Sequence, residues 1–382
     1  MLHLVAVSEI LAFAGASTST FYLAWQRSKV QKWLTIIPRQ DDRDVLRLQS
    51  QYGYNEHSFV GISVQPEVWI DKANNGAVSY NENGKVWVVA GEPLGREEDL
   101  PEITRQFLKF ARTKKKIVAF LPATEKFARS VASADARIVK VGAAPYFDLQ
   151  NWEPRGNSAK KLRLGVNHGR KAGVTVTEVS QVTDQFRREA NKLSNQWAES
   201  RRAGVNFGWI FELVPFQNSE SRKYFAARDL SGNLVGLLAA SPIPAREGWY
   251  LEDVLRSSDA PNGTSDLLVF EALGTLAAQG AKLATLGTVP LSDKGADDLS
   301  SGQSFLTETA LKLSRRHLNS VYNFEGLGTF KSKFVPTWWE SEYAIVSKGR
   351  LIPPRVANAM FNIIIPGGLL QLLQILFFDQ AS

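Results

Sequence analysis

The residues of this sequence best suited to chemistry are acids and bases within apolar, aromatic-rich runs. Asp253 and Arg256 lie in one such run, and Lys331 and Lys333 lie in another. A carboxylate can hold an ammonium group or accept a proton, and a cationic side chain can contact a phosphate or a developing oxyanion. These residue types fit acid–base chemistry on a charged substrate.

Composition excludes several other kinds of chemistry. The chain contains no Cys, so disulfides, thiolate metal sites, iron–sulfur clusters and a Cys nucleophile are excluded. The spacing of the four His residues predicts neither a Ser/His/Asp triad nor a metal site. We therefore expect no cofactor and no metal. The four residues are His3, His57, His168 and His317.

Strand periodicity restricts both candidate pairs. Asp253 and Arg256 are separated by an odd number of residues, so a regular strand directs them to opposite faces unless it ends or bulges between them. Lys331 and Lys333 are two residues apart, so an extended segment would place both on one face, with the flanking aromatic residues on the other. The competing interpretations are surface charges at a strand end and a solvated lysine face.

The elements that must position these residues occur twice. One unit runs from a strand at 86–90 through a helix to a strand at 117–121, and a similar unit runs from 248–255 through a helix to 283–286. Each unit would join parallel strands. The sequence therefore predicts an α/β (α+β) protein of two acetyltransferase-like domains, each a mixed sheet flanked by helices. The loops Gly91–Gly95 and Ala260–Ser265 lack the coenzyme A pattern of that superfamily.

The predicted organisation has five parts along the 382 residues. They are an apolar segment at 1–33, a first domain at 34–150, a basic linker helix at 151–178, a second, catalytic domain at 179–348 and an apolar segment at 349–382.

The net charge of +7 is concentrated in the linker. Residues 155–171 hold six Lys and Arg and no acid, which leaves 7 − 6 = +1 for the rest of the chain. Leu162 and Val166 are spaced to face a core. Uncompensated charge of this kind suits a phosphate backbone or anionic lipid headgroups. The residues predicted to bind tRNA or lipid phosphate are Lys160, Lys161, Arg163, Arg170 and Lys171.

Both ends of the chain suggest contact with a membrane. Residues 10–26 carry no charge and are followed by Arg27, Lys29 and Lys32, so they predict either an anchor with the remainder in the cytoplasm or a helix packed on its own domain. The uncharged stretch 356–378 is broken by a Pro-Gly-Gly turn and predicts an interfacial helix, with a buried helix as the alternative. The expected location is the cytoplasmic face of a membrane.

Several runs resemble the lysylphosphatidylglycerol synthases, the multiple peptide resistance factor family. Residues 250–256 are similar to their strand containing Asp-Leu-Met-Arg, and Leu-Gly-Thr-Val-Pro-Leu-Ser at 286–292 resembles Leu-Gly-Met-Ala-Pro-Leu-Ser. Residues 322–338 follow the family pattern Tyr-Asn-Phe-x-Gly-Leu-x-x-Phe-Lys-x-Lys-Phe-x-Pro-x-Trp. Gly-Glu-Pro-Leu-Gly at 91–95 resembles Gly-Asp-Pro-x-Gly. The resemblance covers about residues 50–348.

This resemblance implies transfer of an aminoacyl group from aminoacyl-tRNA, the co-substrate, to a hydroxyl of phosphatidylglycerol in a membrane. The chain departs from the family at Gly142-Ala143-Ala144-Pro145, where Gly-Glu-Glu-Ala is common, so the amino acid and the acceptor lipid stay open. The implied catalytic residues are Asp253, Arg256, Lys331 and Lys333. The implied substrate-binding residues are Tyr250, Glu252, Asn323, Glu325 and Trp197.

Two other classes of function remain compatible with the sequence. One is a coenzyme A-dependent N- or O-acyltransferase, which would keep the fold and use another donor. The other is a non-catalytic module that binds RNA or a membrane.

Overall fold

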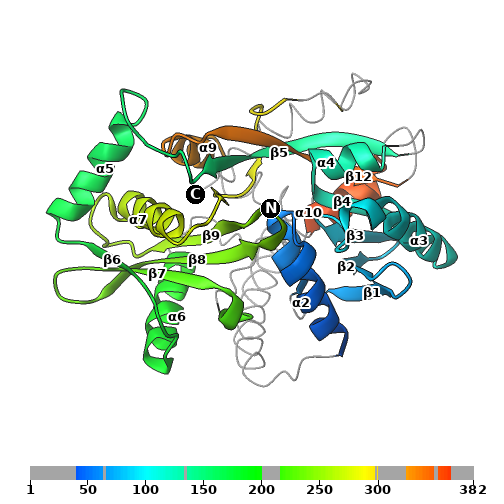
Figure 1. Cartoon of the computed structure of the whole chain (residues 1–382), viewed down its shortest axis with the longest axis horizontal. Coiled ribbons are helices and arrows are strands. Elements are labelled where there is room, and N and C mark those ends of the chain that lie inside the picture. Colours follow the sequence, from blue (N-terminus) through cyan, green and yellow to red (C-terminus); the bar gives the residue numbers. More distant parts are fainter. Residues whose placement is uncertain are drawn as a thin grey trace, which may run out of the picture. The chain divides into compact units, whose positions relative to one another are not determined.

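The structure is a computed structural model, and Figure 1 shows its element order. It describes residues 40–62, 66–132, 136–199, 216–296, 299, 324–347 and 352–362. From Asp44 onward the chain forms one compact unit. Within the described residues, the strands pair into one twelve-stranded mixed sheet in the order β1-β2-β3-β4-β12-β5-β10-β9-β8-β7-β6, with β11 paired to β5.

The first predicted unit is confirmed. β3 and β4 are parallel neighbours joined through α3, and α3 buries Ile103 and Phe107 against the sheet. The strands and helix are β1 (Glu67–Asp71), β2 (Gly76–Asn83), β3 (Val86–Ala90), α3 (Leu100–Thr113) and β4 (Ile117–Thr124).

The second predicted unit is confirmed as well. β9 and β10 are parallel neighbours joined through α7, whose buried Leu267, Leu268 and Leu273 form the centre of the largest core cluster. The elements are β6 (Thr175–Glu178), β7 (Lys223–Arg228), β8 (Leu234–Ile243), β9 (Gly248–Arg256), α7 (Thr264–Ala278) and β10 (Leu283–Thr285).

The two units share their central strands. β12 (Trp338–Val346) follows the second unit in the sequence but lies between β4 and β5 (Arg137–Asp148), antiparallel to both. β5 in turn pairs with β10 and with β11 (Val289–Pro290). Consecutive chain segments therefore do not correspond to separate sheets, and the predicted limits at 150 and 179 stay a prediction.

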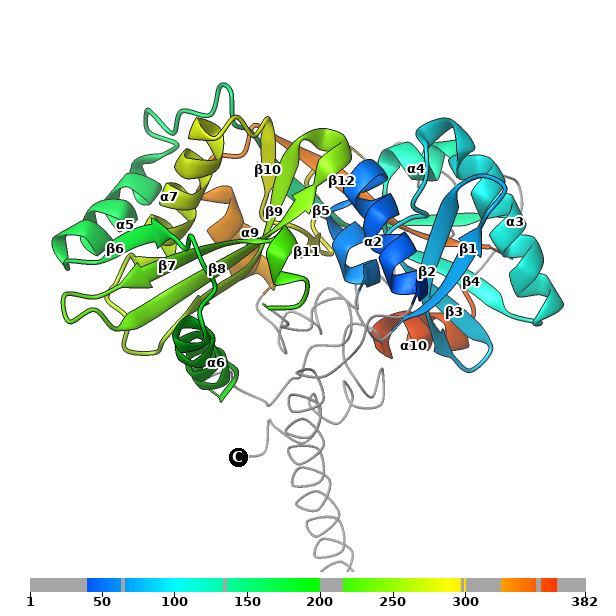
Figure 2. The ribbon, with the colours of Figure 1, turned by 60° about the horizontal axis from the view of Figure 1, so that its bottom comes forward.

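The remaining described elements cover the faces and edges of the sheet (Figure 2). They are α2 (Gln40–Tyr52), α4 (Glu125–Ser130), α5 (Lys160–Lys171), α6 (Asp184–Glu199), α9 (Phe324–Ser332), α10 (Pro354–Asn362) and the short 3-10 helices η2 (Glu56–Ile62), η3 (Glu97–Asp99), η6 (Ser219–Ser221) and η7 (Pro244–Arg246).

The linker helix is α5, and it packs closely against α7. Leu162 and Val166 are buried in the core as predicted. Gly263, at the start of α7, has a φ of 89°, and a Cβ there would lie 2.1 Å from the carbonyl oxygen of Gly165. The two helices can approach this closely because neither backbone carries a side chain at the contact.

The extended conformation predicted for Lys331 and Lys333 is wrong. Lys331 lies in α9, and Lys333 is the first residue beyond the helix. Phe324, Leu327 and Phe330 recur at three-residue spacing, which suits a helix as well as the alternating pattern suits a strand. As a result the two lysines do not share a face: Lys331 is buried and Lys333 is partly exposed.

The C-terminal segment begins as a buried helix. Val356 and Ala359 of α10 are fully buried in a cluster with residues of β3, β4 and β12. This part agrees with the buried-helix alternative, since Val356 and Ala359 pack on the sheet, and the interfacial interpretation of the whole segment stays a prediction. The segment from 363 and the apolar segment 1–33 lie outside the described residues. None of the described helices is long and apolar enough to cross a membrane.

The contact between α5 and α7 predicts that Gly263 tolerates a side chain poorly, and two glycines elsewhere serve as controls. Gly263→Ala would need a left-handed backbone and a shift of α5, so we expect a loss of about 3 kcal/mol in the free energy of unfolding. Gly232→Ala shares the positive φ but meets nothing within 4 Å, so it should lose only about 1 kcal/mol.

Gly274→Ala, on an open part of α7, should be neutral or stabilising by up to about 1 kcal/mol. Urea unfolding followed by circular dichroism measures all three. Equal losses in the free energy of unfolding for Gly263→Ala and Gly232→Ala would show that the contact between α5 and α7 leaves room for a Cβ at Gly263.

Candidate functional site

A bulge in β9 sets the direction of its acidic side chains. Leu251 pairs with Ala240 and Asp253 pairs with Ala239, so Glu252 is an extra residue without a partner on β8. Leu251 therefore packs on the α7 side of the sheet, while Asp253 is turned to the opposite side with Leu255. The strand thus bulges before Asp253 and not between Asp253 and Arg256, and this position decides which residues meet.

Glu252 and Asp253 form a buried acidic pair with one arginine. Arg222 makes an ion pair of 2.8 Å with Glu252 and lies over the ring of Phe59 in η2. Ser241 donates a hydrogen bond to Glu252. Burial, reinforced by Glu252 and opposed by Arg222, raises the pKa of Asp253 to about 8. Asp253 is thus a carboxyl that changes protonation near neutral pH.

Arg256 does not join this pair. The pairing is regular from Asp253 to Arg256, since these residues lie opposite Ala239 and Gly236 respectively. With the bulge before Asp253 rather than after it, the two side chains point to opposite faces, and Arg256 is exposed. The predicted common site for Asp253 and Arg256 is therefore wrong.

Lys331 enters a second buried polar group, which we call the buried cluster: Glu56, His57, Tyr146, Thr288, Lys331 and Glu342. The Lys331 ammonium donates hydrogen bonds of 2.8 Å to the carbonyl oxygens of Gly287 and Thr288. Burial lowers the pKa of Lys331 to about 8, although Glu56 and Glu342 act in the opposite direction. Through its two hydrogen bonds to Gly287 and Thr288, the ammonium fixes the loop that follows β10.

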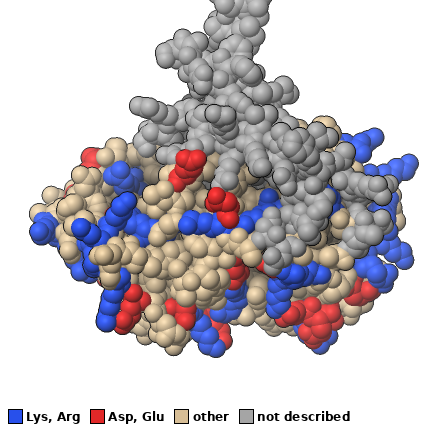
Figure 3. Space-filling view, turned by 90° about the horizontal axis from the view of Figure 1, so that it is seen from above, with Lys and Arg blue, Asp and Glu red and all other residues tan. Residues whose placement is uncertain are grey.

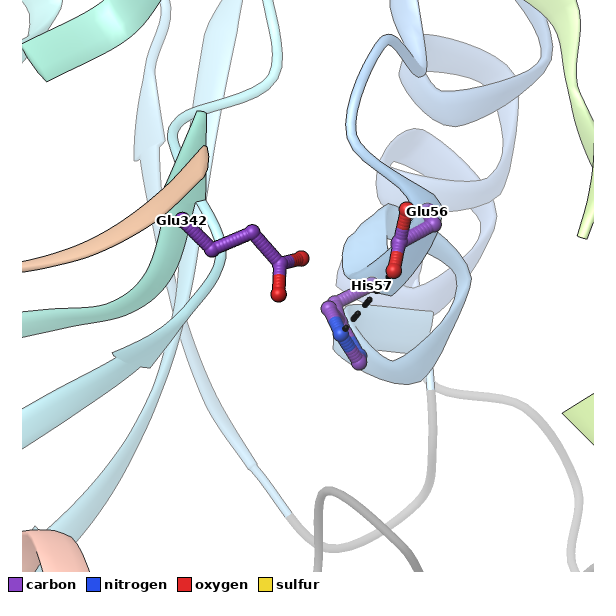
Figure 4. A group of neighbouring side chains, drawn as sticks. All are labelled: Glu56, His57 and Glu342. Carbon is purple, nitrogen blue, oxygen red and sulfur yellow. Dashed lines mark ion pairs between the residues drawn. The ribbon is translucent and has the colours of Figure 1, made fainter. Parts of the chain in front are cut away.

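Two carboxyl groups face each other across this cluster. Figure 4 shows Glu56 from η2 and Glu342 from β12 directed toward the same space, with His57 beside them. Tyr146 donates a 2.7 Å hydrogen bond to Glu56, and Thr288 donates a 3.2 Å bond to Glu342. Burial raises the pKa of both carboxyls, and for Glu342 the nearby Glu56 raises it further.

The neutral form of His57 completes the chain of hydrogen bonds. Its Nε2 lies 2.9 Å from the hydroxyl of Thr288. Burial, with a contribution from Lys331, lowers the pKa of His57 to about 3, so the ring is neutral at physiological pH. Since the Thr288 hydroxyl donates to Glu342, it accepts from an Nε2–H of His57. Sequence spacing gave His57 no role.

Three residues of the buried cluster could also act as ligands of a metal ion. Glu56, His57 and Glu342 each offer a ligand atom, and these atoms lie within 4.8 Å of one another. Carboxylate and imidazole groups are suitable ligands for a divalent cation. The Lys331 ammonium already supplies positive charge to both carboxyls, and we assign the cation of this cluster to Lys331.

Tyr250 connects the cluster to β9. Its ring lies 5.8 Å from the ring of His57, edge to face. Gly287 has a φ of 75°, and a Cβ there would lie 2.4 Å from the Tyr250 ring. The glycine therefore lets the loop turn directly against the tyrosine.

A hollow of about 950 Å³ lies on the other side of this loop. Its wall includes Lys161, Lys294 and Lys333 and the acids Asp293 and Glu325. Val289 and Pro290 also line it, directly after the two residues that hold Lys331. Lys333 forms an ion pair with Asp266 of α7. Residues predicted separately from the linker and from the second domain are brought together here.

The other predicted residues lie elsewhere. Trp197 is half-buried against the cluster formed by α6, β7, β8 and β9. Lys160, Arg163 and Lys171 are exposed on α5. Arg170 pairs with Glu271 at 2.7 Å. Asn323 lies outside the described residues.

Sequence reasoning missed the residues that β12 and η2 contribute. Ala143 and Ala144 of β5, which stand where the resembled family commonly has two Glu, are fully buried. The acids come instead from the neighbouring strand, where Glu340 lies opposite Ala144 and Glu342 opposite Gly142. No short-range pattern could have found them, because 286 residues separate Glu56 from Glu342 in the 382-residue chain (342 − 56).

Comparison with known proteins gives a consistent result. Residues 47–346 match the family model described as phosphatidylglycerol lysyltransferase, C-terminal. The phosphatidylglycerol lysyltransferase of Bacillus subtilis (strain 168) is 24% identical over 317 residues, which cover 82% of this chain and 36% of that protein. The one of Staphylococcus aureus (strain MRSA252) is 22% identical over 327 residues, covering 81% and 36%. The chain spans just over a third of these relatives.

Two solved structures share the fold. The L-PGS of Bacillus licheniformis superposes with a TM-score of 0.71 at 23% identity, covering 86% of this chain and 98% of that one. The C-terminal domain of a putative lysylphosphatidylglycerol synthetase from Agrobacterium fabrum gives a TM-score of 0.69 at 23% identity, with the same coverage. The predicted α/β fold class is confirmed.

The buried cluster predicts unequal effects for two lysines. Lys331→Met leaves two carbonyl groups and two buried carboxyls without their cation, so we expect a loss of about 3 kcal/mol in the free energy of unfolding. Lys282→Met removes an exposed ion pair with Glu247 and should cost less than about 1 kcal/mol. Urea unfolding at neutral pH tests this, and similar small losses would show that the cluster does not need its ammonium.

Proposed function

This chain belongs to the phosphatidylglycerol lysyltransferase C-terminal family, and we propose from that membership that it transfers an aminoacyl group from aminoacyl-tRNA to a lipid hydroxyl. Phosphatidylglycerol is the first candidate acceptor. The relatives are about three times as long as the matched region, so this activity is inferred for the chain from the part they share. We place the reaction at the cytoplasmic face of a membrane.

One observation supports this proposal above the others. The hollow collects Lys161 from the linker helix and Lys333 from the end of α9, two cations predicted from unrelated parts of the sequence. Both proposed substrates carry phosphate, which these cations would attract. The acids Asp293 and Glu325 in the same wall suit the ammonium of an aminoacyl group.

The proposed reaction is a transesterification. The oxygen of the lipid hydroxyl attacks the ester carbonyl carbon of the aminoacyl-tRNA, and the ester oxygen at the tRNA terminus leaves and takes up a proton. The resemblance implies Asp253 as a catalytic residue, and burial raises its pKa to about 8, so we assign it proton removal from the hydroxyl. Asp253 lies on the face of β9 opposite α7 and is not part of the wall of the hollow, so the hydroxyl would have to reach it from that face. The loop 287–290 lies between Tyr250 on the β9 side and the hollow.

Lys331 takes a different role from the one first implied. Its ammonium donates to two loop carbonyls and lies close enough to both buried carboxyls to influence their pKa, so it positions the loop rather than contacting a substrate. Lys333, in the wall of the hollow, keeps a role in binding. Arg256 is exposed away from Asp253, and we assign it no part in the reaction.

The helix N-termini disfavour the alternative donor, coenzyme A. In acetyltransferase-like units a pyrophosphate binds where backbone N–H groups are exposed at the helix start. Here α5 packs onto the start of α7 at Gly263, and Asp266 adds a carboxylate to its first turn. The start of α3 follows Glu97, Glu98 and Asp99. The close packing of α5 opposes a pyrophosphate at the start of α7, and the three consecutive acids make the start of α3 unfavourable for one.

Labelled lipid formation tests the proposed activity. We expect cells that express the full chain to yield a new aminolipid when one of the twenty amino acids is supplied with a radioactive label, detected by chromatography of the extracted lipids. RNase should abolish the activity in a lysate, and acetyl-coenzyme A should not protect the protein from thermal unfolding. A search through all twenty amino acids without any new lipid would contradict the proposal.

The pKa of Asp253 predicts a pH dependence of the transfer rate. Below about pH 8 the carboxyl is mostly protonated and cannot accept a proton, so the rate should rise about tenfold per pH unit and level off above about pH 8. Asp253→Asn should lower the rate at least about 100-fold and remove this dependence. Initial rates corrected for spontaneous ester hydrolysis measure it, with Glu247→Gln as the exposed-carboxyl control. A flat profile for the parent protein would exclude Asp253 as the base.

A further inference from the structure

We propose that the outer face of α5, together with the turn between β7 and β8, is a docking surface for an anionic lipid bilayer. We call this set, Lys160, Leu164, Lys171 and Leu230, the docking face. The proposal deepens the proposed function, on which it rests for the lipid nature of the substrate, by stating which side of the protein meets the membrane.

The helical period of α5 separates its two sides. Leu162, Gly165, Val166 and Gly169 are buried against α7 and the core. Lys160, Leu164 and Lys171 follow one another at spacings of four and seven residues, which places them in one stripe on the opposite side of the helix. All three are exposed, so this stripe is the outermost surface of the helix.

The docking face carries both of the strongly exposed large apolar side chains found among the described residues. Leu164 is 49% exposed and Leu230 is 85% exposed. Leu230 lies at the β7–β8 turn, and a Cβ on Gly173 would lie 2.4 Å from its side chain. Gly173 follows the end of α5 by two residues, so the second leucine lies beside the last turn of the helix. Figures 1 and 2 show the helix and the turn at the same edge.

Charge on this edge is predominantly positive. Residues 155–171 contain six Lys and Arg and no acid. Arg170 is compensated by Glu271, whereas Lys160 and Lys171 have no ion pair in the described part of the chain. Asp229 in the turn accepts hydrogen bonds from the N–H groups of Ser231 and Asn233 and from the Asn233 side chain. Figure 3 shows one face of the molecule, on which basic and acidic side chains both occur.

The combination of cations with exposed leucines favours a bilayer over RNA. Lysines alone would suit either polyanion, because both present phosphate. A leucine that is 85% exposed gains nothing from a phosphate backbone, but it gains free energy when it enters the apolar boundary of a bilayer. The leucines therefore decide between the two partners.

Vesicle binding by the full chain tests the docking face. The probes are vesicles of phosphatidylglycerol with phosphatidylcholine, and vesicles of phosphatidylcholine alone, measured by co-sedimentation. The double variant Leu164→Ser with Leu230→Ser should bind the anionic vesicles about tenfold more weakly than the parent. The double variant Leu164→Ser with Leu230→Met, which keeps an apolar side chain at 230, should bind more tightly than the double serine variant. Lys160→Gln with Lys171→Gln should weaken it about 30-fold at low salt and much less at high salt.

A matched pair of lysines outside the docking face serves as the control for the vesicle-binding experiment. Lys109→Gln with Lys192→Gln removes two other exposed lysines and should change binding less than about threefold. Thermal unfolding of each variant checks that the fold is retained. If the serine variants bind vesicles like the parent, the proposal is overturned, and loss of tRNA binding only in the lysine variant would identify an RNA surface. Aminolipid formation that persists without docking would overturn this proposal alone, while docking without aminolipid would overturn the proposed function alone.

Discussion

The insertion of β12 between β4 and β5 is the constraint on which the site depends. A strand in the middle of a sheet must satisfy hydrogen bonds on both edges, so its register is fixed from two sides. That register places Glu342 opposite Gly142 and Glu340 opposite Ala144. It also joins the two strand–helix–strand units into one sheet, so neither unit could hold the buried cluster without the other.

The buried cluster is unfavourable by itself, because it removes four ionisable side chains from water. Two carboxyls, a lysine and a histidine are each at least nine-tenths buried, and burial opposes the charged form of each group. The cost is reduced because the nearby ammonium attracts both carboxylates and donates hydrogen bonds to two loop carbonyls. What the protein gains is a fixed loop between Tyr250 and the hollow.

The linker helix has two functions that follow from its two sides. Its small, buried side lets it lie directly against the start of α7, where it covers the first N–H groups of that helix. Its outer side carries the exposed lysines and Leu164. One helix thus both closes the start of α7 and presents a basic outer surface.

The sequence by itself determined the local elements and the type of protein. The two strand–helix–strand units, the linker helix with Leu162 and Val166 inward, and the family were all evident, because they depend on periodicity and on contiguous runs of residues. The tertiary structure alone decided which side chains meet. The position of the β9 bulge separated Asp253 from Arg256, and α9 turned Lys331 inward and Lys333 outward. Glu56 and Glu342 meet only because distant strands pair, and such pairing depends on contacts that no short stretch of sequence contains.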